Sequence, residues 1–117
     1  MEIIEGSGSD GLYLFQDGGV FYLMIISPCG HYNIELMIQL NEEEISLYQT
    51  QGRPYIDAFA DTVRFIGLCT INSKSIYLKR KVSSDLYRKA WLVIIAWRVI
   101  QLLKFKLLIP RHFKTAR

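Results

Sequence analysis

The pattern of apolar and polar positions divides the chain of 117 residues into a strand-rich start and a helical remainder. Two apolar runs, at 12–15 and 20–26, flank an Asp-Gly-Gly turn, which is a good hairpin signal. The segment HYNIELMIQL at 31–40 then alternates, as a strand does when one face is buried and the other meets water or a partner. We expect an antiparallel β-meander over residues 12–40, preceded by a flexible Gly/Ser-rich lead-in over residues 1–11.

Two helices are expected over residues 41–66. Asn41 can cap the first helix, and Glu44 at the third helical position completes a capping-box sequence. Gly52 is suited to end that helix, and Pro54 is suited to the first turn of the next one. Apolar residues continue at helical spacing to residue 66, so the segment is predicted to be a helical pair.

A long helix is expected over residues 84–108. Its segment AWLVIIAW, at 90–97, is apolar all round, which indicates a central helix buried by both the sheet and the other helices. Trp91 and Trp97 are six positions apart, so one is expected to face the sheet and the other the helical pair. Before this helix, residues 67–74 read as a loop or weak strand, and the alternation at 75–82 fits an edge strand.

These elements predict a single α+β domain over residues 1–117: an antiparallel three- to four-stranded sheet with a helical pair and a long C-terminal helix. The N-terminal segment is acidic and lacks the basic and apolar regions of a signal peptide, so a cytoplasmic location is expected. Cys29 and Cys69 fit that compartment as buried or idle thiols, although their spacing leaves a single disulfide open.

Charge is distributed unevenly along the chain. Residues 1–73 hold ten acids and two bases, a net charge of about −8, and residues 74–117 hold twelve bases and one acid, about +11. One interpretation is internal cancellation, with the basic end folded along the acidic front. The other is that the two parts present opposite fields to different partners.

The sequence offers little for catalysis, so no enzymatic activity, cofactor or metal is expected. It lacks nucleophile-elbow, Walker, dinucleotide and metalloprotease motifs. His31 and His112 have no evident partner, and Cys29 with His31 provides too few ligands for zinc. The acids at 42–44 and 57/61 fit solvated helix faces better than a metal site.

The basic C-terminal third supports an alternative class of function. Lys and Arg are interleaved with aromatic residues at 74–81 and 111–117, as in nucleic-acid-binding segments, although no recognised binding motif frames them. The window 91–109 is mostly apolar but contains Arg98, Lys104 and Lys106, which are costly within a membrane span. Neither a nucleic acid nor a membrane is the expected partner, and a membrane- or nucleic-acid-associated regulator that uses the basic C-terminal third is kept as the second hypothesis.

The segment 38–66 resembles bacterial immunity proteins of contact-dependent growth inhibition and related polymorphic toxin systems. The resemblance rests on IQLNEEEI, the Gly52 break and the following YIDAFAD, and it covers about thirty residues. It implies a cytoplasmic protein that binds and neutralises a cognate toxin domain, in many cases a nuclease, without a small-molecule substrate. An acidic surface suits such a partner. The residues expected to bind the toxin are Glu35, Glu42, Glu43, Tyr48, Asp57 and Asp61.

Overall fold

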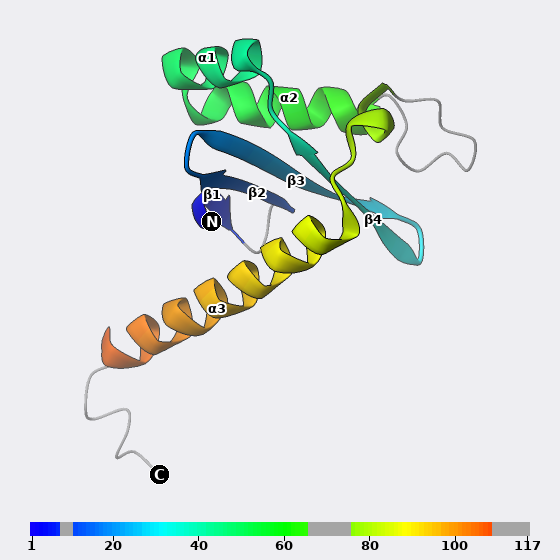
Figure 1. Ribbon diagram of the computed structural model, residues 1–117. Helices are drawn as coiled ribbons and strands as arrows, with labels where there is room; N and C mark the ends of the chain where they lie inside the picture. The colour runs from blue at the N-terminus through cyan, green and yellow to red at the C-terminus, as the bar shows by residue number, and fades with distance from the viewer. Residues whose placement is uncertain (8–10, 66–75, 109–117) are drawn as a thin grey trace.

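One antiparallel sheet organises the molecule. The computed structural model describes residues 1–7, 11–65 and 76–108. Its elements are β1 (Glu2–Ser7), β2 (Leu12–Asp17), β3 (Val20–Cys29), β4 (Tyr32–Gln39), α1 (Glu42–Gln51), α2 (Arg53–Phe65), the 3-10 helix η1 (Ile76–Arg80) and α3 (Ser84–Leu108). The strands pair in the order β1-β2-β3-β4, with α1 and α2 over one face and α3 along the other (Figure 1). The predicted α+β class is confirmed, with four strands.

The first strand corrects the prediction of a flexible lead-in over residues 1–11. Residues 2–7 pair with β2 from Glu2 opposite Gln16 to Ser7 opposite Leu12, with a register shift between Ile3 and Glu5. Ile3 packs against the α3 side of the sheet and Ile4 against the α1–α2 side. These two isoleucines give the short strand apolar contacts on both faces, which its Gly/Ser-rich surroundings concealed. Residues 8–10 lie outside the described residues.

The predicted meander is confirmed from β2 to β4. Asp17 pairs with Val20 across the β2–β3 turn, where Gly18 has a φ of 63°, a left-handed conformation that glycine adopts without strain. The register of the meander alternates its side chains between two apolar clusters. The buried cluster on the α1–α2 side comprises Leu12, Leu14, Phe21, Leu23, Ile25, Leu36, Ile38, Leu40, Ile56, Ala60 and Val63. The buried cluster on the α3 side comprises Tyr13, Phe15, Met24, Met37, Ala90 and Ile94.

The helical pair is confirmed through residue 65; residue 66 and the segment 67–74 lie outside the described residues. Asn41 and Glu44 form the capping box, with Glu44 N–H donating to Asn41 Oδ1 at 2.8 Å and Asn41 N–H donating to Glu44 Oε1 at 2.9 Å. Gly52 ends α1 with a φ of 74° and donates to the Tyr48 carbonyl at 2.7 Å. Local capping signals therefore located this pair correctly.

The predicted edge strand at 75–82 is wrong for most of its length. Residues Ile76–Arg80 form a 3-10 helix, and Lys81 makes an isolated bridge to Ile38 in β4. The bridge is reinforced by the Val82 N–H, which donates to the Met37 carbonyl at 3.0 Å. The alternation in the sequence thus reflects a brief contact with the sheet edge rather than a fifth strand.

The position of α3 also differs from the prediction. Ala90 and Ile94 are buried against the sheet, whereas Leu92 is 63% exposed and Ile95 55% exposed. The helical pair lies across the sheet from α3, so α3 is an outer layer and not a central helix (Figure 1). A run that is apolar all round does not distinguish burial on every side from burial on one side.

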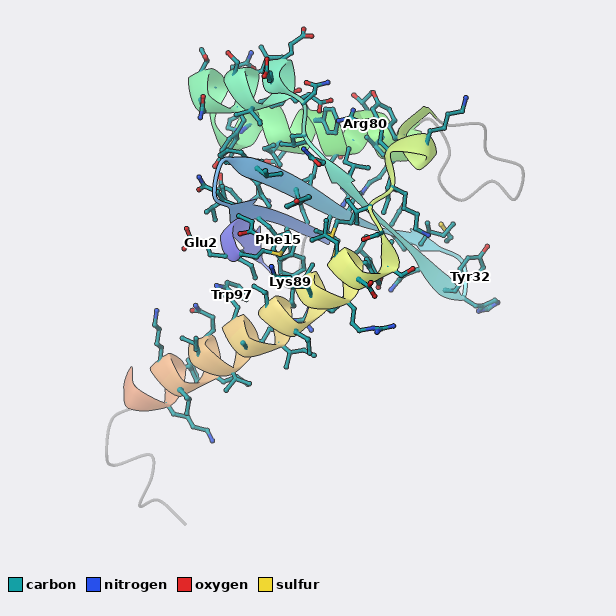
Figure 2. The ribbon with its side chains drawn as sticks, in the orientation of Figure 1. Glu2, Phe15, Tyr32, Arg80, Lys89 and Trp97 are labelled. Carbon is teal, nitrogen blue, oxygen red and sulfur yellow. The ribbon has the colours of Figure 1, made fainter. Side chains whose placement is uncertain are left out.

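Both tryptophans lie on the sheet side of α3, so the expected contact of one with the helical pair is wrong. Trp91 Nε1 donates to Glu35 of β4 at 3.2 Å, and Trp97 packs edge-to-face on Tyr13 with ring centroids 6.3 Å apart. Figure 2 shows Phe15 and Trp97 in this layer between sheet and helix. The same contacts cover part of the β4 face that was expected to meet water or a partner.

Cys29, at the end of β3, is buried and disulfide-bonded. The expectation of a buried thiol is therefore wrong in its oxidation state, and the alternative of a disulfide holds for this cysteine. Cys69, the other cysteine of the chain, lies outside the described residues.

Candidate binding surface

Five of the six predicted binding residues lie on the helical pair, and we call its four acids the acidic surface: Glu42, Glu43, Asp57 and Asp61. Glu42 and Glu43 occupy the first turn of α1, and Asp57 and Asp61 are one turn apart on α2. All four side chains are exposed. The exposure of Asp57 and Asp61 agrees with the amphipathic pattern, because the apolar positions of α2, such as Ile56 and Val63, face the sheet.

Arginines offset part of this negative charge. Arg53 Nε lies 2.8 Å from Asp57 Oδ1, and Arg64 Nη1 lies 3.5 Å from Asp61 Oδ1. Residues 41–65 hold five acids and two bases, so the helical pair retains a net charge of −3. Among the described residues, arginine ion pairs are thus found at Asp57 and Asp61 of the acidic surface and not at Glu42 or Glu43.

Glu44, next to Glu43 in sequence, is buried and has a structural role instead of forming part of the acidic surface. Its side chain is buried and accepts two hydrogen bonds from Arg80 of η1, one of them 2.9 Å from Nη1 to Oε2. Burial opposes ionisation, but the hydrogen bonds from Arg80 and from the Asn41 N–H prevail and hold the pKa of Glu44 below its ordinary value. Arg80 also donates to the Gln39 carbonyl at 2.8 Å, so it joins η1 to both α1 and β4.

Tyr48 ties α1 to the edge strand of the sheet. Its hydroxyl donates to Glu5 Oε2 at 3.1 Å, and its ring packs edge-to-face on Phe21 with centroids 6.4 Å apart. Burial, followed by the hydrogen bond and the negative charge of Glu5, raises the pKa of Tyr48. Tyr48 is half-buried, so these contacts give it a structural role in addition to any role in binding.

Removing the Tyr48 hydroxyl gives a direct test of this tie. Tyr48→Phe is expected to lower the free energy of unfolding by about 1–2 kcal/mol, because Glu5 loses a half-buried hydrogen-bond donor. Tyr55→Phe, the same change at a half-buried position of α2, is the matched control and should have a smaller effect. Urea denaturation measures both variants, and equal losses would contradict the role of the Tyr48–Glu5 bond.

Glu35 lies apart from the other predicted residues. It is on the α3 side of the sheet, where Oε2 accepts the hydrogen bond from Trp91. Near it is an open pocket of about 290 Å³, lined by Asn33, Glu35, Lys81, Val82, Ser84 and Tyr87. The six predicted residues therefore do not form one surface, because the sheet separates Glu35 from the other five.

Within residues 1–7, 11–65 and 76–108, no three His, Cys, Asp or Glu side chains cluster as metal ligands would. None of the helices in those ranges combines the length and the apolar character needed to cross a bilayer. What the described part of the chain does present is an acidic surface on one side and α3 on the other.

The exposure of α3 differs from the central, buried helix that its apolar run predicted. Seven of its large apolar side chains are between 49% and 64% exposed, at positions 92, 95, 99, 100, 102, 103 and 105. The signal was present in the sequence, because an apolar run with cations at both ends suits a helix with one covered face as well as a buried one.

Comparison of the chain with family models, curated proteins and solved structures found no match.

Proposed function

We propose that the protein is an immunity protein that binds and neutralises a cognate toxin domain through the acidic surface, without catalysis. The observation that supports this most is the exposure of Glu42 and Glu43 at the start of α1. Both occupy the first turn, yet it is Glu44 that forms the capping box and pairs with Arg80. Helix capping therefore accounts for Glu44 and leaves the other two carboxylates available to a partner.

The physical logic is electrostatic complementarity. A nuclease toxin has a basic cleft that binds a polyanion, and adjacent carboxylates on a rigid helix can occupy the same field. Charge of this kind chiefly raises the association rate, whereas specificity comes from packed side chains near the centre of the interface. We assign the leading contacts to Glu42 and Glu43, with Asp57 and Asp61 beside them. Tyr48 and Glu35 hold the supporting structure through Glu5 and Trp91.

The proposal places the protein in the cytoplasm, where an immunity protein of this class meets the incoming toxin. Structural disulfides are uncommon in that compartment, and Cys29 is disulfide-bonded, so the location needs its own test. Protease added to spheroplasts of the host should leave a tagged chain intact. Digestion of the tagged chain would place it outside the cytoplasm and overturn this part of the proposal.

The decisive experiment for function is co-purification. The tagged chain is expressed in its own host together with the C-terminal domain of the protein encoded immediately upstream. The proposal expects a stable one-to-one complex and survival of cells that produce that domain. Failure to form a complex with it, or survival without a complex, would count against toxin neutralisation.

Charge reversal then identifies the interface. The double variant Glu42→Lys/Glu43→Lys is expected to weaken toxin binding by at least about tenfold, mainly by slowing association, because attraction becomes repulsion at the start of α1. Surface plasmon resonance at low and high salt measures the rates, and the loss should shrink as salt screens the charges. The matched control is Glu2→Lys on the exposed edge strand β1. Equal effects of the two variants would exclude the acidic surface as the binding site.

A further inference from the structure

The outward side of α3 carries an apolar stripe with a cation at each end. Arg88, Leu92, Ile95, Val99, Leu102 and Lys106 follow one another at steps of four, three, four, three and four residues. Residues at this spacing lie along one side of a helix. All six are exposed, and the four apolar members of the stripe are 63%, 55%, 49% and 61% exposed in chain order.

The far end of α3 extends past the sheet. Residues 101–106 are all exposed, and they include Leu103 at 56% and Phe105 at 64%. In Figure 1 the last turns of the helix continue beyond the edge of the sheet, away from α1 and α2. A monomeric soluble protein seldom leaves a contiguous apolar surface of this kind exposed to water. The stripe is therefore expected to bind another protein copy, a different partner or a membrane.

The charges of α3 distinguish between a second copy of the chain and an anionic surface as the binding partner. Asp85 is the only acid of α3, and none follows it to residue 117. If a second copy packed along the stripe in parallel, Arg88 would meet Arg88 and Lys106 would meet Lys106. If it packed antiparallel, Arg88 would meet Lys106. Either arrangement places like charges together at the ends of the seam, which disfavours self-association.

An anionic lipid surface can bind both the apolar residues of the stripe and the cations at its two ends. Apolar side chains enter the boundary between headgroups and acyl chains, while Arg and Lys at the ends of the stripe reach phosphate groups on their long stems. Lys104 adds a further exposed cation, whereas Lys89 lies 3.3 Å from Asp17 and Arg98 donates to the Tyr13 hydroxyl at 2.8 Å. The Phe105 ring lies between Lys104 and Lys106 in sequence and suits the same interface.

We infer that α3 binds the surface of an anionic membrane, lying along it rather than crossing it. The acidic surface is on the other side of the sheet and would face away from the lipid, free to meet a protein (Figure 1). This inference does not rest on the proposed function, because a chain that binds no toxin can still bind lipid through α3. Conversely, a toxin complex can form without lipid.

The test is flotation of the chain of 117 residues with vesicles. Vesicles of phosphatidylcholine mixed with phosphatidylglycerol are expected to carry the chain to the top of a density gradient, and vesicles of phosphatidylcholine alone are not. Lys106→Glu should weaken binding to the anionic vesicles by about fivefold or more, the effect of one cation near such a surface. Val99→Gln/Leu102→Gln should weaken it by about tenfold or more, from the lost burial of apolar area.

Tyr32→Gln removes an apolar side chain that is 57% exposed at the β3–β4 turn, far from the free end of α3, and should not change flotation (Figure 2). Circular dichroism and thermal unfolding confirm that each variant is folded. The inference fails if the chain does not float with anionic vesicles, if it floats equally with neutral ones, or if Tyr32→Gln matches the double variant. A dimer without flotation, abolished by Val99→Gln/Leu102→Gln, would assign the stripe to a second copy.

Discussion

Ile94→Ala is expected to lower the free energy of unfolding by about 2–4 kcal/mol, whereas Ile95→Ala should change it by less than about 1 kcal/mol. Ile94 is fully buried in the cluster on the α3 side of the sheet, and its neighbour Ile95 is 55% exposed. Truncating Ile94 leaves a cavity in this buried cluster. Truncating Ile95 removes atoms that already contact water. Urea denaturation of the two variants, chemically identical and adjacent in sequence, measures the difference.

This pair of variants tests the placement of α3 directly. Equal and large losses would mean that α3 is covered on both sides, as the run AWLVIIAW first indicated. Repeating the urea denaturation at several protein concentrations then shows what covers the outward side of α3. A loss at Ile95 that appears only at high concentration would show that a second copy covers the stripe, whereas a loss at every concentration would place another part of the chain over it.

Much of the fold could be predicted because its signals are local. The Asp-Gly-Gly turn fixed the β2–β3 hairpin, and the Asn41–Glu44 capping box with Gly52 defined α1. Each depends on a few neighbouring residues whose conformational preferences agree with the final structure. The strand β1 lacked such a signal, because its two isoleucines become informative only when β2 is present to pair with them.

The relations across layers could not be predicted in the same way. The apolar residues of α3 indicated burial, but the sequence does not state which side of a sheet a helix covers or how far it extends beyond the edge. The alternation of β4 predicts Glu35 on the polar face of the strand, and the Trp91 hydrogen bond that covers it joins residues 56 positions apart. Tyr48 is an aromatic residue close in sequence to acids, and its hydrogen bond to Glu5 spans 43 positions. Long-range contacts of this kind decide which polar residues are structural.

The ion pair between Glu44 and Arg80 is the clearest example of such a long-range contact. In the sequence alone, the three glutamates at 42–44 look like one acidic cluster. Three features separate Glu44 from its neighbours: burial, a capping role and a bidentate arginine. We therefore expect Glu44→Ala to lower the free energy of unfolding at pH 7 by about 2–4 kcal/mol, the combined loss of the capping-box hydrogen bond from the Asn41 N–H and of the charged hydrogen bonds from Arg80. Glu43→Ala, the adjacent exposed control, should cost less than about 1 kcal/mol.

The pH dependence of Glu44→Gln isolates the charge, because glutamine can still accept the capping hydrogen bond. The pKa of Glu44 in the folded chain is below the ordinary value of 4.5, so its carboxylate stabilises the fold fully above that value. This stabilisation is lost as the pH falls below 4.5 through the folded pKa. The difference in free energy of unfolding between wild type and Glu44→Gln should therefore be constant from neutral pH down to about 5 and shrink at lower pH. A difference that is already absent at pH 7 would show that the pair contributes as little as most exposed salt bridges, and that η1 is held by its backbone bridge to β4 instead.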